Sequence, residues 1–334
     1  MMKRREFTRS LLGLPLAATL PSEAAFGATK EPIALPEGGS ITDVPGVKVG
    51  HHTLSERPTG CTVVICEHGA TAGVDVRGSA PGTRETDLLS PVNTVEQVQA
   101  ILLSGGSAYG LAAATGVVRW LEEHNLGYKI GKGVVPIVPA AILMDLGVGD
   151  FKIRPGDEHG YKACVAATTG PMAEGNVGAG AGATVGKMFG PKFAMKSGLG
   201  TASVKIGDTG IVVGAIVAVN AVGDVINPHS GKVVAGARSE DNKGYRDSMA
   251  AVLKGYRVVM ENGANTTIGI VATNAPFTKT QMTKIAQMSH DGYARSINPV
   301  HTMADGDTIF AMSTGLAKVK ADLSAIGAIA ATVM

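Results

Sequence analysis

A turn passes directly into a strand in the stretch NGANTTIGIVAT at residues 262–273. Its first four residues favour a tight turn, because Asn and Gly tolerate backbone conformations that most residues avoid. The remaining residues are β-branched or apolar and carry no charge, which is typical of a strand that is buried on both faces. The sequence therefore predicts a sharp turn at 262–265, followed by a buried strand over 266–273 that begins at Thr266.

Further strands and helices are predicted on both sides of this stretch. Apolar or β-branched runs predict strands at residues 62–66, 72–76, 211–220 and 308–313, the first two forming a hairpin. Apolar residues at helical spacing predict helices at 94–103, 108–123 (with Ser107 as N-cap), 156–169 and 278–293 (with Thr278 as N-cap). Because helices and strands come in blocks, we expect an α+β sandwich with helices outside two sheets rather than a doubly wound parallel sheet.

The composition indicates a globular protein that acts on small molecules. The chain has 334 residues, 45% of them hydrophobic, and a net charge of only +2. Such a weak charge gives no field that would attract nucleic acid or an anionic membrane surface. Aromatic residues make up only 4% of the chain, so stacking on nucleobases is not expected. The three cysteines, Cys61, Cys66 and Cys164, have no metal-binding spacing, and we expect them to be small core residues.

The first 28 residues are typical of an export signal rather than of a folded domain. KRREF at 3–7 precedes an apolar run at 11–20 and small residues at 24–28, as in a twin-arginine signal peptide. The apolar run is shorter than the roughly 20 residues that span a bilayer. We therefore predict a signal at 1–28, a periplasmic or secreted protein, and a single domain over 29–334.

Several motifs for cofactors and nucleophiles fail when they are tested position by position. In GAGAGATVGK at 178–187, the first glycine of a phosphate loop falls on Ala181, and Met188 follows the lysine where Ser or Thr would bind magnesium. Glycine spacing also fails for a dinucleotide site, and the eight histidines contain no zinc motif. Ser107 is one residue out of register for a serine-hydrolase elbow. No cofactor and no metal are expected.

Thr266 is the candidate nucleophile. A threonine hydroxyl needs a base beside it, and a threonine at a chain terminus carries its own α-amino group as that base. A terminal amine with a pKa near 8 is partly neutral at ordinary pH and can take up the hydroxyl proton. The residue types alone also fit the start of an ordinary strand.

The chain resembles the DmpA/P1 family of N-terminal-nucleophile hydrolases (peptidase family S58), which includes L-aminopeptidase/D-esterases, β-peptidyl aminopeptidases and nylon oligomer hydrolases. The resemblance runs from ITDVPGV at 41–47, through SGGSAYGL at 104–111 and NTTIGIVATN at 265–274, to STG at 313–315. It implies an αββα sandwich of the DmpA/ornithine-acetyltransferase type. It also implies self-cleavage into a large subunit, 29–265, and a small subunit, 266–334, assembled as a homotetramer.

The resemblance also assigns the site. It makes Thr266 the nucleophile and Asn265 the residue that becomes the new carboxyl end. Asn220 matches an oxyanion-stabilising amide, and Lys187 matches a lysine near the nucleophile.

Three further positions are matched to substrate contacts. Asp305 and Asp307 match polar residues that orient the nucleophile and contact the substrate amine. Met144 stands where related nylon hydrolases have an aromatic residue, often tyrosine, so their exact substrate preference does not carry over to this chain, whereas the mechanism does.

Three functions remain open on this basis. The first is an autoproteolytic amide hydrolase, expected to act as an aminopeptidase on short peptides or on peptide-like oligoamides. The second is an acyltransferase of the ornithine acetyltransferase type, which shares the self-cleaving architecture. The third is an exported binding protein that keeps the fold without being cut.

Overall fold

The computed structural model describes residues 39–256 and 265–334, which lie in one compact unit. The predicted signal at 1–28 and most of the predicted turn at 262–265 lie outside the described residues. The strands are β1 (Lys48–Thr53), β2 (Gly60–Val76), β3 (Thr83–Arg84), β4 (Gln97–Ser104), β5 (Tyr128–Ile130), β6 (Gly133–Val135), β7 (Ala140–Ile142), β8 (Thr184–Val185), β9 (Met195–Lys196), β10 (Leu199–Lys205), β11 (Val212–Asn220), β12 (Asp224–Ile226), β13 (Val233–Ala235), β14 (Thr266–Thr273), β15 (Ile297–Asn298) and β16 (Thr308–Ser313). The α-helices are α1 (Ala113–Glu123), α2 (Asp157–Val165), α3 (Ser248–Leu253), α4 (Lys279–Ser296) and α5 (Leu323–Val333).

One large mixed sheet organises the unit. Its strand order is β10-β11-β14-β16-β2-β4-β7-β3, with β1 paired to β2. Neighbours are antiparallel except for the pairs β14–β16 and β4–β7, which are parallel. The predicted strands at 211–220, 266–273 and 308–313 are therefore confirmed, and they lie side by side as β11, β14 and β16.

The two halves of this sheet pack against each other. Because side chains alternate between the faces of a strand, each half has an inner and an outer face. Ile216, Ile268 and Phe310 on the inner face of β11, β14 and β16 belong to one buried cluster with Val64 of β2 and Ile101 of β4. The sheet thus folds over on itself, and its main core lies between the two halves.

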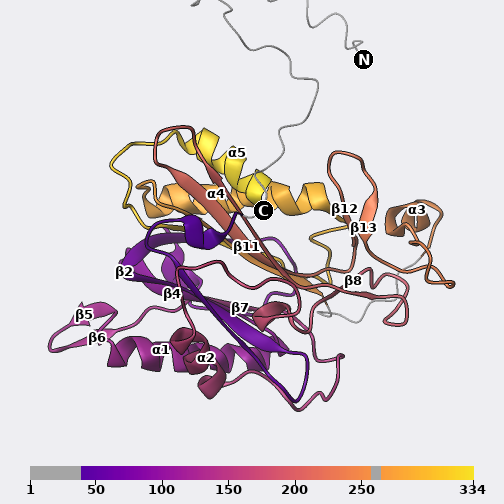
Figure 1. Ribbon diagram of the computed structural model, residues 1–334, viewed down its shortest axis with the longest axis horizontal. Helices are drawn as coiled ribbons and strands as arrows, with labels where there is room; N and C mark the ends of the chain where they lie inside the picture. Colours follow the sequence, from indigo (N-terminus) through magenta and orange to yellow (C-terminus); the bar gives the residue numbers. More distant parts are fainter. Residues whose placement is uncertain (1–38, 257–264) are drawn as a thin grey trace, which may run out of the picture. The chain divides into compact units, whose positions relative to one another are not determined.

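Helices cover both outer faces. Val213 and Ile309 on the outer face of one half pack in a cluster with residues of α4 and α5. Val63 and Leu102 on the outer face of the other half pack with residues of α1 and α2. The layers are therefore helices, sheet, sheet and helices, with α4 and α5 on one side and α1 and α2 on the other (Figure 1). The predicted αββα sandwich is confirmed.

The hairpin predicted around residues 67–69 is wrong. Residues 60–76 form the single long strand β2, whose register with β4 breaks between Ile65 and Ala70. Its first part pairs with β1 and β4, whereas its last part pairs with β16. The two apolar runs therefore bond to different neighbours and connect the two halves of the sheet. Local pattern could not show this, because the partners are distant in sequence.

The helix predicted at 94–103 is also wrong, since these residues contain β4. Ala100 and Leu102 face α1 and α2, while Ile101 and Leu103 face the core between the sheet halves. A strand that is buried on both faces has apolar residues at every position, so its spacing also satisfies a helical pattern. In contrast, the helix at 278–293 is confirmed as α4, with Thr278 forming the predicted N-cap.

Ser107 does not cap a helix. It lies inside a 3-10 turn, Ser107–Ala112, with a positive φ of 54°, and the preceding Gly106 occupies the N-cap position without a side-chain bond. The three cysteines are buried free thiols, as predicted. In the part of the chain that the structure describes, no helix is long and apolar enough to cross a membrane.

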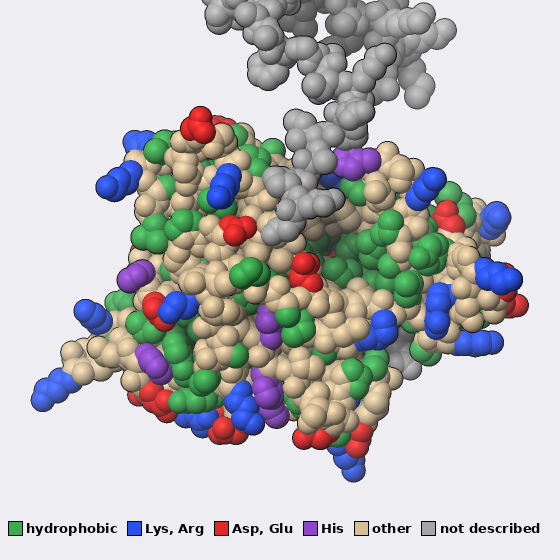
Figure 2. Space-filling view, in the orientation of Figure 1, with side chains coloured by type: hydrophobic (Ala, Val, Ile, Leu, Met, Phe, Trp, Pro, Cys, Tyr) green, Lys and Arg blue, Asp and Glu red, His purple; other side chains and the backbone are tan. Residues whose placement is uncertain are grey.

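The surface is hollowed on one face. Figure 2 shows hydrophobic side chains lining a hollow between the part that carries α4 and α5 and the part that carries β12 and β13. β12 begins at Asp224, four residues after Asn220, where β11 ends.

We predict that the core between the two sheet halves carries much of the stability. Ile216→Ala should lower the free energy of unfolding by about 2 to 5 kcal/mol, because it leaves a cavity at a side chain that is 0% exposed. The control is Val92→Ala, at a side chain that is 89% exposed, which should change it by less than about 0.5 kcal/mol. Urea unfolding followed by circular dichroism measures both, and equal effects would contradict the assignment of the core.

Candidate active site

Thr266 is the first residue of β14 and lies directly opposite Asn220, the last residue of β11. In an antiparallel pair, residues opposite each other point to the same face. Thr266 and Asn220 therefore share the face of Ile268 and Ile216, which is the inner face between the sheet halves. Both residues are buried, so the site is an extension of the main core.

The backbone around Gly306 meets the peptide that precedes Thr266. Gly306 N–H donates to the Asn265 carbonyl oxygen at 3.0 Å, and the Thr266 hydroxyl Oγ1 donates to the same oxygen. A Cβ at position 306 would lie 2.8 Å from Thr266 Oγ1 and 2.6 Å from the Ala80 carbonyl oxygen. Glycine thus leaves room for the hydroxyl beside this carbonyl, and its N–H supplies a donor to it. Gly306 was not among the residues predicted from the sequence.

The side-chain amide of Asn220 is held in one orientation. Its Oδ1 accepts from Lys187 Nζ at 2.8 Å and from Thr184 N–H at 3.0 Å. Its Nδ2 donates to the Met144 carbonyl oxygen at 2.9 Å. Two donors on one atom and an acceptor on the other fix which atom is oxygen and which is nitrogen. One N–H of this amide is left for a further acceptor.

Lys187 is held against Asn220 and among carboxylates. Its Nζ also donates to the Asn220 backbone oxygen at 3.0 Å. Burial lowers the pKa of Lys187 to about 7. The negative charges of Asp305, Asp145 and Asp307 act in the opposite direction and raise this pKa. Lys187 therefore changes charge near neutral pH, where an ordinary lysine stays protonated.

Asp305 and Asp307 lie on either side of Gly306 and make different contacts. Asp307 Oδ1 accepts the N–H of Thr267 at 2.6 Å, which ties it to the residue after the candidate nucleophile. Asp305 accepts the N–H of Thr302 at 2.9 Å and also its hydroxyl. Burial raises the pKa of Asp305, with a further contribution from the charge of Asp307.

His301 contacts Asp307 and was not among the residues predicted from the sequence. Its backbone N–H and Nδ1 contact Asp307 Oδ2 at 3.1 and 2.8 Å, with a positive φ of 55° at His301. The ring of His301 also packs edge-on against His290 of α4 at 4.8 Å. The closeness of His301 to Asp307 in the sequence was the available signal.

The structure thus places all the predicted site residues together. Thr266, Asn220, Lys187, Asp305 and Asp307 are linked by the contacts above, with Asn265 next to them. Met144 joins them through its backbone carbonyl, which accepts from Asn220 Nδ2. Ser107 is not part of this set. Their roles in chemistry remain predictions.

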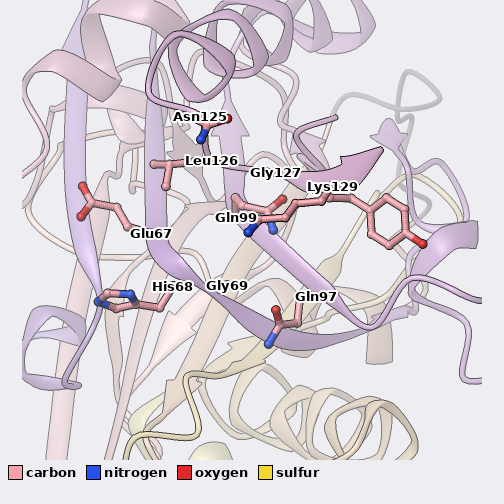
Figure 3. Close-up of a pocket in the computed structure, with 10 residues that line it drawn as sticks. Glu67, His68, Gly69, Gln97, Gln99, Asn125, Leu126, Gly127 and Lys129 are labelled. Atoms are coloured by element: carbon pink, nitrogen blue, oxygen red, sulfur yellow. The ribbon is translucent and has the colours of Figure 1, made fainter. Parts of the chain in front are cut away.

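Among residues 39–256 and 265–334, no three His, Cys, Asp or Glu side chains are placed to hold a metal ion. A polar cavity of about 360 Å³ lies away from the predicted site (Figure 3). It is lined by Glu67, His68, Gly69, Gln97, Gln99, Asn125, Leu126, Gly127, Tyr128 and Lys129, and none of the predicted site residues is among them.

The sandwich is similar to solved aminopeptidase structures. A Burkholderia sp. beta-aminopeptidase superposes with a TM-score of 0.65 at 24% identity, over 90% of this chain and 85% of that chain. The l-aminopeptidase d-ala-esterase/amidase from Ochrobactrum anthropi, a variant of the Ntn hydrolase fold, gives 0.62 at 21% identity, over 85% of this chain and 76% of that chain. The fold is therefore that of the N-terminal-nucleophile hydrolases.

The chain belongs to peptidase family S58, whose profile matches residues 39–333. An uncharacterized aminopeptidase of Mycobacterium leprae is 45% identical over 84% of this chain and 80% of its own length. A 6-aminohexanoate-oligomer endohydrolase of Agromyces sp. is 33% identical over 87% of this chain and 82% of its own length. The resemblance to the DmpA/P1 family is confirmed, and the protein is a hydrolase that acts on amide bonds.

We predict that Lys187 makes stability depend on pH. Between its folded pKa of about 7 and its ordinary value of 10.5, the unfolded chain binds a proton that the folded chain does not. Stability from this group therefore rises with pH in that window, by about 1 kcal/mol per pH unit, and is constant below it. Lys187→Met removes this dependence. The free energy of unfolding of the variant should therefore exceed that of the wild type by a large amount near pH 6.5 and by a small amount near pH 9.5.

Urea unfolding at the two pH values measures this difference. The control is Lys232→Met at an exposed lysine, which should show no such change with pH. A gain from Lys187→Met that is the same at both pH values would contradict the lowered pKa.

Proposed function

We propose that the protein is an autoproteolytic amide hydrolase whose nucleophile, Thr266, is freed when the chain breaks after Asn265. One observation carries the proposal. The Thr266 hydroxyl contacts the carbonyl oxygen of the residue before it, and this same oxygen accepts the N–H of Gly306. A hydroxyl beside a carbonyl that already has a donor on its oxygen is arranged for attack on that carbonyl.

The self-cleavage can be written with these groups. Thr266 Oγ1 attacks the carbonyl carbon of Asn265, and the negative charge that develops on the oxygen is stabilised by Gly306 N–H. The C–N bond breaks, its nitrogen takes a proton, and an ester joins Asn265 to the Thr266 oxygen. Water then hydrolyses the ester, which leaves a carboxyl group on Asn265 and a free amine on Thr266. Lys187, with a pKa of about 7, has a neutral fraction near neutral pH that can accept the hydroxyl proton.

The same site then acts on an external amide. The free amine of Thr266 takes the hydroxyl proton, Oγ1 attacks the substrate carbonyl, and the amine leaving group departs with a proton. The free N–H of Asn220 donates to the developing oxyanion, because the other atoms of this amide are bound by Lys187, Thr184 and Met144. Water hydrolyses the acyl-enzyme with the Thr266 amine as base, and no step uses a cofactor.

Short peptides or peptide-like oligoamides are the proposed substrates. Relatives named aminopeptidase and oligomer endohydrolase support this class. Asp305 and Asp307 place two carboxylates beside the nucleophile, and a carboxylate suits the protonated amine at the end of such a substrate. Export by the twin-arginine route and assembly into a homotetramer belong to the same proposal. Export rests on the sequence of residues 1–28, and the homotetramer rests on the resemblance to the family.

Thr266→Val should abolish both self-cleavage and hydrolysis, because it removes the attacking oxygen while keeping a β-branched side chain. The matched control, Thr273→Val, changes a buried threonine at the other end of β14 and should stay cleaved and active. Intact-mass analysis detects the two fragments split between Asn265 and Thr266. A panel of L-, D- and β-amino acyl anilides measures hydrolysis. An uncut wild type, or a Thr266→Val variant that still hydrolyses substrate, would refute the proposal.

The panel also separates hydrolysis from acyl transfer. Each substrate is incubated with and without an added amine acceptor. Release of free acid at the same rate in both cases supports the hydrolase. Product that forms only with the acceptor would assign an acyltransferase instead.

A further inference from the structure

Asp145 is a buried carboxylate beside the site to which the proposed mechanism gives no role. It pairs with Arg57, whose Nη2 lies 2.5 Å from Asp145 Oδ1, and both side chains are fully buried. Arg57 also donates through Nη1 to the Ile153 carbonyl at 2.7 Å and through Nε to the Val148 carbonyl at 2.5 Å. A guanidinium can bind several acceptors at once because its donors form a rigid planar fork. Arg57 therefore fixes the segment that begins at Asp145.

Glycines make the space for this carboxylate. A Cβ at Gly105 or at Gly182 would lie 2.3 Å from Asp145 Oδ2. Gly106 N–H donates to Asp145 Oδ1 at 2.8 Å, and the Thr59 hydroxyl donates to Oδ2 at 2.6 Å. The two glycine-rich motifs that failed as nucleotide and serine-nucleophile sites thus converge on one carboxylate.

Asp145 is next in sequence to the residue whose carbonyl holds the Asn220 amide, the proposed oxyanion donor. Met144 precedes Asp145, and its carbonyl oxygen accepts Asn220 Nδ2 at 2.9 Å. A shift in the Met144 carbonyl would turn the Asn220 amide, because that carbonyl is the acceptor that holds its nitrogen. Misplacement of a donor by about 1 Å can reduce a rate by about 100-fold.

We propose that Asp145, held by Arg57 and the surrounding glycines, is a positioning residue that orients the Asn220 amide through the carbonyl of Met144. The inference rests on the proposed function, because it assumes that Asn220 donates to the oxyanion. A buried ion pair contributes little net stability, since desolvation offsets its attraction, so the pair of Arg57 and Asp145 suits a role in geometry.

The charge of Asp145 also reaches Lys187. Three carboxylates, Asp305, Asp145 and Asp307, raise the pKa of Lys187 against the effect of burial. Asp145 likewise raises the pKa of Lys196, whose burial lowers it. Removal of the charge on Asp145 should therefore also lower the pKa of Lys187, an effect separate from the loss of positioning.

The test uses the full chain with Asp145→Asn and an amino acyl anilide that the wild type hydrolyses. We expect kcat to fall about 10- to 100-fold while KM changes less than about threefold, because the oxyanion donor acts in the transition state. The pH profile of self-cleavage, in which Lys187 is the proposed proton acceptor, should move to lower pH.

Two further variants keep the test decisive. Thr59→Val removes only one hydrogen bond to Asp145, and it should lower kcat in the same direction, about three- to tenfold. If Asp145→Asn does not fold, the kcat of Thr59→Val tests the positioning role by itself. Asp224→Asn is the matched control, because Asp224 is also a buried carboxylate that accepts backbone N–H groups, from Ala237 and Ser248, and has a glycine beside it. It should leave the pH profile unchanged.

The outcomes separate this inference from the proposed function. If folded Asp145→Asn and Thr59→Val keep the wild-type kcat and pH profile while the wild type is cut after Asn265 and active, the positioning role is wrong and the mechanism stands. An equal fall in kcat and an equal pH shift in Asp224→Asn would also overturn it. A wild type that is neither cut nor active contradicts the proposed function itself.

Discussion

The register between β11 and β14 is the constraint on which the rest of the site depends. It places Asn220 opposite Thr266, on the same face as Ile216 and Ile268. A slip of one residue would turn the Thr266 hydroxyl toward the helices and would remove Ile268 from the core between the sheet halves. Hydrophobic packing along the strand therefore fixes the position of the hydroxyl at its end. The hydrophobic core and the candidate site lie on the same face of the sheet, so a change of register would displace both.

Hydrogen bonds to neighbouring residues hold the buried Asn220 amide and the buried Asp307 carboxylate in place. The Asn220 amide lies between Lys187, Thr184 and the Met144 carbonyl, and Asp307 accepts the N–H of Thr267. Unpaired, such groups would cost on the order of a few kcal/mol each in a dry interior. Burial also lowers the pKa of Lys187 to about 7, so a lysine becomes a group that exchanges protons near neutral pH.

Local sequence predicted the elements that are long, apolar and bounded by clear signals. β11, β14 and β16 have continuous apolar runs, and α4 has its capping box at Thr278. β4 was mistaken for a helix because burial on both faces removes the alternation that marks a strand, and β2 was divided because its two parts bond to different neighbours. In the site, Thr266, Asn220, Lys187, Asp305 and Asp307 were predicted because they match motifs of the family, and the structure brings them together. Gly306, Arg57 and Asp145 were not predicted, because their contacts join distant residues, such as Arg57 and Asp145, which are 88 residues apart. His301 was also not predicted, although it lies only six residues before Asp307.

Breaking the backbone is proposed to create the catalytic base on the same residue that carries the nucleophile. The most direct measurement is chemical labelling of free α-amines in purified active protein, followed by peptide mapping. The account predicts a labelled amine on Thr266, in an amount that rises in proportion to activity as the precursor matures. Full activity in protein whose Thr266 nitrogen cannot be labelled under denaturing conditions would contradict it.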